Sequence, residues 1–285
     1  MAQMSSIPVS DLRAWIDGQP QFLGNQWLNA LESRKKEEAQ FHDDDRKDGR
    51  DLSPELSENR RYYEAADIVF RATHGWIASR APGGDFLDYA CGSGATTIYA
   101  AAAGANLAVG IDISPVTVEA ASRRAREAGV ANRTRFLQRD CEETGFPDAS
   151  FDTCLCSGML HHLDLTRGFP ELHRIMKPRG RILCVEALSY NPVIQAYRRF
   201  TPRLRTQWER EHILGLKELR YATRWFQVEN VRFFLLVSPL ATLLPKGIIR
   251  RAGLAVGHAI DAVLTRIPGL QLLSWQFTFE LVKVR

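Results

Sequence analysis

The chain has 285 residues, of which 45% are hydrophobic and 25% are charged, and this is the composition of an ordinary soluble globular protein. The longest apolar run without a charge, residues 233–245, is too short to span a bilayer as a helix. The net charge of +4 is uneven, because the segment from Asn191 onward holds 15 Lys and Arg against 6 Asp and Glu. Such a basic segment suits an acidic substrate or an anionic membrane surface, and a solvated face equally well.

The five cysteines fall in or beside predicted strands and turns, without the Cys-x-x-Cys spacing of a metal site. Free thiols in a reducing cytosol account for them, and we expect no metal. No charged and then apolar leader stands at the start of the chain. We therefore expect a cytoplasmic protein, and a peripheral contact with a membrane and a homodimer stay open.

Residues 1–80 are predicted to form a helical cap or lid. Residues 1–20 are expected to be a loose start, and apolar residues at helical spacing predict a helix over 22–41. A second helix over 55–80 begins at Ser53-Pro54, which suits a cap and a first-turn residue. Tyr63 in that helix is a candidate for contact with a cofactor, and ordinary packing is the alternative.

The stretch 85–114 has the pattern strand, glycine turn, helix and strand. Residues 86–90 and 107–111 are predicted strands, and an Ala-rich helix over 95–103 follows the turn at Gly92 and Gly94. The second strand ends on Asp112, whose carboxylate can accept hydrogen bonds from both hydroxyls of a ribose. A dinucleotide fingerprint fits poorly, because Thr97 stands where the third glycine belongs.

The pattern Asp-x-Ala-Cys-Gly-x-Gly from Asp88 to Gly94 resembles the first motif of class I methyltransferases that use S-adenosylmethionine. Ala90 replaces the first glycine of that motif. The resemblance implies S-adenosylmethionine as cofactor and S-adenosylhomocysteine as product. It assigns cofactor contacts to Asp88, Ala90, Cys91, Gly92, Gly94, Asp112 and Ile113. A plain glycine turn in a structural α/β unit is the alternative.

Further matches to this family follow in order. A helix is predicted over 116–128 and a third strand over 134–137, and the resemblance implies that Asp140 and the backbone of Cys141 contact adenine. Residues 146–152 match the family's lead into a fourth strand over 153–156. That strand ends at Ser157, which we also assign to the cofactor.

His161 and His162 follow the fourth strand, at the edge of the sheet where ligands bind in doubly wound folds. In the resembled family this loop lies between methyl donor and acceptor. Either histidine is thus a candidate for a general base or an orienting group. The alternative is that a histidine caps the next helix, predicted over 168–176, or packs on the cofactor.

Beyond a fifth strand, predicted over 181–187, the chain leaves the shared pattern. Two helical insertions are expected at about 190–215 and 235–270, with strands over 228–234 and 276–284. Arg198 and Arg199 are candidates to bind an acidic group of the acceptor, and Trp208 to line its pocket. We expect residues 81–285 to form the catalytic core.

These patterns together predict a Rossmann-like, doubly wound α/β fold. Its seven-stranded sheet should be mostly parallel with an antiparallel last strand, covered by a helical cap. The predicted function is transfer of a methyl group from S-adenosylmethionine to a small, apolar, lipid-like or natural-product acceptor. Nucleic acid is not expected as a partner. The fourth strand ends in Ser157-Gly158-Met159-Leu160 and not in the Asn/Asp-Pro-Pro-Tyr/Phe tetrad of methyltransferases that act on nucleic acid. A cyclising or decarboxylating enzyme and a silent cofactor-binding subunit are the alternatives.

Overall fold

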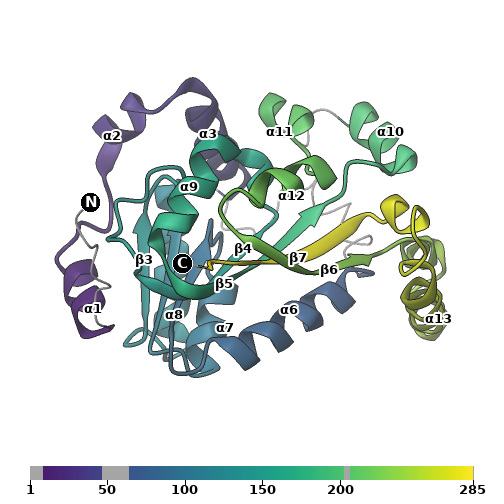
Figure 1. Cartoon of the computed structure of the whole chain (residues 1–285), viewed down its shortest axis with the longest axis horizontal. Coiled ribbons are helices and arrows are strands. Elements are labelled where there is room, and N and C mark those ends of the chain that lie inside the picture. Colours follow the sequence, from purple (N-terminus) through teal and green to yellow (C-terminus); the bar gives the residue numbers. More distant parts are fainter. Residues whose placement is uncertain (1–8, 47–63, 202–205, 285) are drawn as a thin grey trace.

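One seven-stranded sheet organises the chain (Figure 1). The computed structural model describes residues 9–46, 64–201 and 206–284. The strand order is β3-β2-β1-β4-β5-β7-β6, and β7 runs antiparallel to both of its neighbours. The strands are β1 (Asp85–Tyr89), β2 (Leu107–Asp112), β3 (Thr134–Gln138), β4 (Phe151–Ser157), β5 (Met176–Ala187), β6 (Gln227–Phe234) and β7 (Gln276–Val282). The predicted mostly parallel sheet with an antiparallel last strand is confirmed.

Helices cover both faces of this sheet, as the apolar runs of its buried strands require. One face packs against α1 (Val9–Asp17), α9 (Leu165–Ile175) and α12 (Leu216–Ala222). The other packs against α6 (Asp67–Arg80), α7 (Ala95–Ala102), α8 (Pro115–Glu127) and α13 (Ile248–Leu264). Alternate residues of β1 point to opposite faces of the sheet. Leu87 packs in the core under α1, α9 and α12, and Phe86 packs in the core on the other face.

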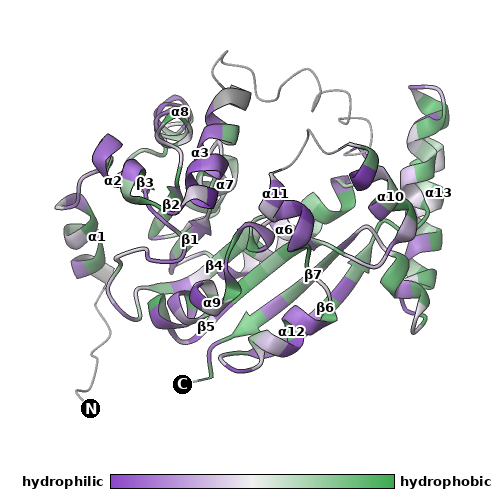
Figure 2. Cartoon of the chain, turned by 90° about the horizontal axis from the view of Figure 1, so that it is seen from above, coloured by the Kyte–Doolittle hydropathy of each residue, from purple (hydrophilic) through white to green (hydrophobic). Residues whose placement is uncertain are grey.

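In the described ranges, four helices lie along the edge of the sheet where the parallel strands end (Figures 1 and 2). They are α2 (Gly24–Ala30), α3 (Ser33–Arg46), α10 (Pro192–Phe200) and α11 (Gln207–Glu211). Asp43 at the end of α3 accepts a hydrogen bond from Ser114, the N-cap of α8. The described residues also form the short 3-10 helices η1 (Leu160–His162), η3 (Ser238–Leu243) and η4 (Leu270–Leu273).

The N-terminal part differs from its sequence prediction. The loose start expected over residues 1–20 is wrong for 9–17, which form α1 and bury Leu12 and Ile16 in the core. The single helix expected over 22–41 is two helices, because Leu31 is extended and ends α2. In the described part of the helix expected over 55–80, α6 starts at Asp67. No helix in the described ranges is both long and apolar enough to cross a membrane.

Candidate active site

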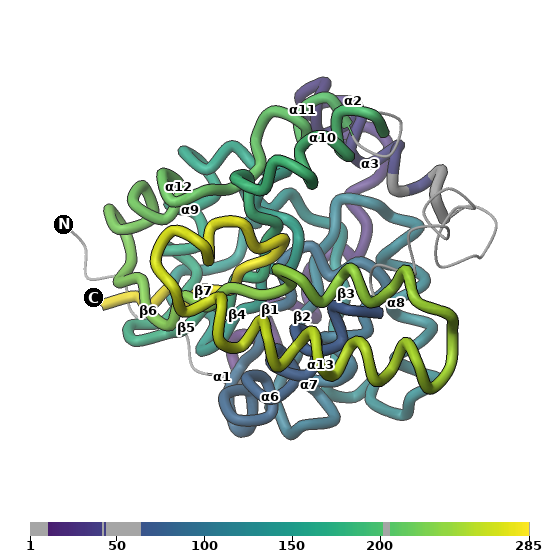
Figure 3. Tube along the Cα trace, turned by 90° about the vertical axis from the view of Figure 1, so that its right-hand side faces the viewer, coloured from purple at the N-terminus to yellow at the C-terminus, as the bar shows by residue number. Residues whose placement is uncertain are grey.

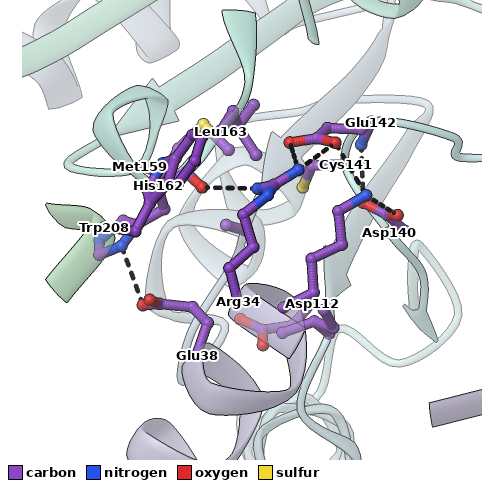
Figure 4. A pocket seen from close by; sticks show the side chains of 13 residues that line it. Arg34, Glu38, Asp112, Asp140, Cys141, Glu142, Met159, His162, Leu163 and Trp208 are labelled. Atoms are coloured by element: carbon purple, nitrogen blue, oxygen red, sulfur yellow. Dashed lines mark hydrogen bonds and ion pairs between the residues drawn. The ribbon is translucent and has the colours of Figure 1, made fainter. Parts of the chain in front are cut away.

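A cavity of ≈ 80 Å³ opens beyond the carboxyl ends of the parallel strands (Figure 4). Its walls come from α3, from the segments after β1, β2 and β3, from the η1 region and from α11. The lining residues are Arg34, Lys35, Glu38, Ala90, Asp112, Ile113, Asp140, Cys141, Glu142, Met159, His162, Leu163 and Trp208. The predicted cofactor residues of three neighbouring strands therefore meet in one place, as the topology of a doubly wound sheet requires.

The glycine turn after β1 and the carboxylate after β2 hold each other in position. The Asp112 carboxylate accepts hydrogen bonds of 3.0 Å from the backbone N–H groups of Gly92 and Ser114. Gly94 has a φ of 77°, and a Cβ there would stand 2.7 Å from the Cβ of Ala121. Only glycine allows α8 to pack this closely, so the turn and Asp112 share one rigid frame.

Asp88, near the end of β1, links the glycine turn to helix α7. Its buried carboxylate accepts a 2.8 Å hydrogen bond from the hydroxyl of Thr97 in α7. Burial raises its pKa to about 7, although the bonds from Thr97 act in the opposite direction. Of the predicted cofactor contacts, Asp88, Cys91, Gly92 and Gly94 are absent from the lining of this cavity, and the side chains of Asp88 and Cys91 are buried. Ser157 is exposed at the end of β4, and Tyr63 lies outside the described residues.

Two cations of α3 reach into the site and meet two carboxylates that follow β3. Lys35 forms ion pairs with Asp140 and, at 2.8 Å, with Glu142. Arg34 binds both oxygens of Glu142, at 2.7 and 2.6 Å. The side chains of Lys35, Asp140 and Glu142 are nearly inaccessible to solvent, so solvent screens their charges only weakly. This cluster fastens α3 across the mouth of the site (Figure 4).

The side of the cavity toward α11 is aromatic and apolar. The guanidinium of Arg34 lies 4.6 Å from the ring centroid of Trp208, within the range of a cation–π contact. His162 Nδ1 lies 2.9 Å from a carboxylate oxygen of Glu38. Burial lowers the pKa of His162, and the neighbouring His161 lowers it further. His162 is therefore neutral at neutral pH.

His161 is held by a buried carboxylate that sequence reasoning missed. Glu186 Oε2 lies 2.7 Å from His161 Nδ1, while its other oxygen accepts from the N–H groups of Met159 and Leu160. Burial alone lowers the pKa of His161, but the charge and hydrogen bond of Glu186 outweigh it, and the net pKa is raised. Because Nδ1 bonds the carboxylate, Nε2 is the nitrogen left to accept a proton. Its place near the end of β5, at the edge of the sheet where ligands bind, was the sequence signal that could have identified Glu186.

The two predicted substrate arginines face different surroundings. Arg198 is buried and forms a 2.8 Å ion pair with Glu209 of α11, whereas Arg199 is exposed. Glu209 also lies 3.9 Å from His161 Nε2. The ligand atoms of His161, His162 and Glu209 lie within 4.8 Å of one another, which is a spacing that a metal ion could bridge. Of the three predicted substrate residues, Trp208 lines the cavity.

Comparison with known proteins agrees with this geometry. Residues 87–184 match the family described as methyltransferase domain. This part of the chain is thus similar to a methyltransferase domain. It includes the glycine turn, Asp112, Asp140 and both histidines, whereas α3, Glu186 and the segment from Asn191 onward lie outside the match.

Two curated relatives match the chain over part of their length. The chain is 38% identical over 101 residues to a 27-O-demethylrifamycin SV methyltransferase of Amycolatopsis mediterranei, covering 35% of this chain and 37% of that protein. It is 33% identical over 109 residues to the ubiquinone/menaquinone biosynthesis C-methyltransferase UbiE of Geotalea daltonii, covering 37% and 46%. The matches thus span less than half of either relative.

Among solved structures, geranyl diphosphate C-methyltransferase from Streptomyces coelicolor A3(2) superposes with a TM-score of 0.61. The alignment covers 90% of this chain and 99% of that one, at 16% identity. That enzyme was crystallised with Mg²⁺, geranyl diphosphate and S-adenosyl-L-homocysteine. At this identity the likeness shows a shared fold.

Proposed function

We propose that the protein transfers a methyl group from S-adenosylmethionine to a small acceptor that is apolar or lipid-like. One observation carries the proposal: Asp112 and Asp140, at the ends of neighbouring strands, line the same cavity as His162, beside the Glu186–His161 pair. A cofactor site and a proton acceptor thus meet at one edge of the sheet. The partial relatives are named for 27-O-demethylrifamycin SV and for ubiquinone/menaquinone biosynthesis, and these names support a small-molecule acceptor.

The residues present fit S-adenosylmethionine, which supplies a methyl group activated by a sulfonium. Asp112 would accept from the ribose hydroxyls, and Asp140 and the backbone N–H of Cys141 would hold the adenine. Ala90, Ile113 and Cys141 add apolar surface between these carboxylates. The Lys35 ammonium now bonds Asp140, so it must yield that oxygen, and Glu142 is the second carboxylate on which it can remain. A shift of α3 would admit the cofactor and enlarge the cavity.

His161 is proposed as the general base. Its Nδ1 bonds Glu186, which fixes the ring and the tautomer, and Nε2 accepts the proton that the acceptor loses as its bond to the methyl group forms. The imidazolium formed in this step is stabilised by the adjacent carboxylate. Such a base is needed when the acceptor atom is a hydroxyl, an amine or an acidic carbon. His162, which lines the cavity, is the competing candidate.

The acceptor side favours an apolar molecule. Met159, Leu163 and Trp208 border the cavity next to His162. The cap formed by α2, α3, α10 and α11 would exclude water when closed, which a methyl transfer requires so that the acceptor and not water is aligned with the methyl group. We place this reaction in the cytoplasm.

The test uses S-adenosylmethionine with a labelled methyl group and a panel of quinols, isoprenoid diphosphates and hydroxylated polyketides. We expect a product heavier by one methylene unit, with His161→Asn abolishing turnover and leaving the Kd for S-adenosylhomocysteine unchanged. His162→Asn is the matched variant. If it alone abolishes turnover, His162 is the base. If no cofactor binds in calorimetry, the proposal is wrong, and binding with a product of unchanged methyl count points to cyclisation or decarboxylation.

A further inference from the structure

Helix α13 buries mainly polar residues, with Leu254 packed in part against the core, and exposes most of its apolar residues, which largely reverses the pattern of a helix that completes a core. It lies at the margin of the molecule (Figures 2 and 3). The reversal follows the helical period. Arg250, Gly257 and Asp261 are buried, whereas the residues between them on the opposite side are exposed.

The inner side of α13 is fixed by polar contacts and close backbone packing. Asp261 accepts hydrogen bonds from the backbone of Val237, at 2.7 Å, and from the hydroxyl of Ser238, at 2.6 Å. A Cβ on Gly257 would stand 2.8 Å from the Cα of Ser238. Arg250 donates to the carbonyl of Leu244 at 2.9 Å and pairs with Glu64. These contacts set the rotation of the helix, so the apolar side cannot turn inward without losing them.

The outer side presents a continuous apolar stripe, which we name the α13 stripe. Its members are Ile249, Val256, Ile260, Val263 and Ile267, at intervals of seven, four, three and four residues. Val263 is 61% exposed and Ile249 56%. Leu240 and Leu243, in the neighbouring η3, are also exposed. At 17 residues the helix is about 25 Å long, and a stripe of this length on a soluble surface marks a contact site.

The charges around the stripe have one sign. Between Ser238 and Trp275 the only acidic residue is Asp261, which is buried and bonded as described. The exposed charges of this region are Lys246, Arg251 and Arg266. The apolar residues 233–236 near it are not part of this surface, because Leu235 is buried and its neighbours are partly buried in the core.

We propose that the α13 stripe docks on an anionic membrane surface, with the helix lying in the interface. Exposed isoleucine and valine would enter the boundary of headgroups and acyl chains, and the three cations would meet the lipid charge. A second copy of this chain fits less well. A two-fold contact buries the same patch on both subunits, which would bring Lys246, Arg251 and Arg266 of both copies together. This inference concerns binding and does not depend on methyl transfer.

The experiment uses the full chain and vesicles of phosphatidylcholine with or without an equal part of phosphatidylglycerol. We expect wild-type protein to co-sediment with the anionic vesicles, less so at high salt and least with the neutral ones. V256D/I260D should lower the partition coefficient by about tenfold or more. V284D, an equally exposed apolar position beyond β7, is the matched control and should bind like wild type. R251E/R266E should remove the salt-sensitive part of binding.

A second measurement does not depend on charged variants. All five native cysteines are buried, so a polarity-sensitive dye can be attached selectively at V256C, with V284C as control. A blue shift with anionic vesicles only at position 256 supports the proposal. Equal shifts at both positions, no binding by wild type at low salt, or binding unchanged in V256D/I260D would overturn it. A dimer that dissociates in V256D/I260D, without vesicle binding, would assign the stripe to self-association.

Discussion

The two sides of the candidate active site are built in different ways. The cofactor side consists of short segments after β1, β2 and β3. Backbone N–H groups of these segments bond its carboxylates Asp112 and Asp140, and Lys35 of α3 is a second partner of Asp140. The acceptor side joins η1, the end of β5, α10 and α11, and its key groups are held by side chains far apart in sequence, as Glu186 holds His161.

This difference explains which side relatives share. The match to the methyltransferase domain covers residues 87–184, so it includes the segments after β1, β2 and β3 and both histidines but stops before Glu186, Arg198 and Glu209. A site held by local backbone bonds tolerates changes elsewhere in the chain, whereas a site held by distant side chains changes with every insertion. We therefore expect the acceptor specificity of this chain to depend on the residues outside the match.

The largest effect is expected on the acceptor side, from Glu186→Gln. Without the carboxylate the His161 ring loses its orientation and its charge partner, and kcat should fall by about 10²–10⁴. A base must be unprotonated, so in the wild type kcat falls as pH drops through the raised pKa of His161. In the variant burial lowers this pKa, so the fall moves to lower pH. Rate–pH profiles measure both.

Glu280→Gln is the matched control for Glu186→Gln. Glu280 is a buried glutamate of the neighbouring β7, and its partners are Arg181 and Asn230, away from the histidines. The control should keep the wild-type rate and profile. If Glu186→Gln keeps the position of the acid limb while kcat falls, Glu186 acts on packing alone and His161 is not the base.

The cofactor side is tested by Asp112→Ala. Removing the acceptor of the ribose hydroxyls and of the Gly92 N–H should weaken S-adenosylhomocysteine binding by about ten- to a thousandfold. Asp148→Ala, which removes an acidic residue paired with Arg174 before β4, should leave the Kd unchanged in calorimetry. Equal affinity of Asp112→Ala and wild type would place the ribose elsewhere.

The sequence predicted most of the sheet and its helices because their signals are local. The turn at Gly92 and Gly94, the N-cap at Ser114 and the buried strands each follow from neighbouring residues. Asp112 was assigned to the cofactor from its place at a strand end and Asp140 from the resemblance to the family, and both assignments stay predictions. Lys35 and Glu186 were missed because their roles depend on partners more than 20 residues away, which periodicity does not report.

A smaller effect, on the free energy of unfolding, is expected from Asp88→Asn. The pKa of Asp88 in the folded protein, about 7, lies above the usual range of an aspartate, so the folded state holds this proton more tightly. The stabilising contribution is present below about pH 4 and is lost as pH rises through 7. Asparagine keeps an acceptor for Thr97 and carries no charge. At pH 8 the variant should therefore be more stable, by about 1–4 kcal/mol, in thermal or urea unfolding.

The smallest expected effect concerns Ala90, where the resembled motif has glycine. Ala90 has a φ of 64°, in the left-handed region where a Cβ costs about 1–2 kcal/mol. Glycine relieves this strain but gains freedom in the unfolded chain, so Ala90→Gly should stabilise the protein by no more than about 1 kcal/mol. Because Ala90 lines the cavity, the variant should bind S-adenosylhomocysteine at least as tightly as wild type. Ala131→Gly, at an exposed loop position, is the control for general glycine effects. A loss of stability in Ala90→Gly that equals the loss in the control would show that the turn at residue 90 is not strained.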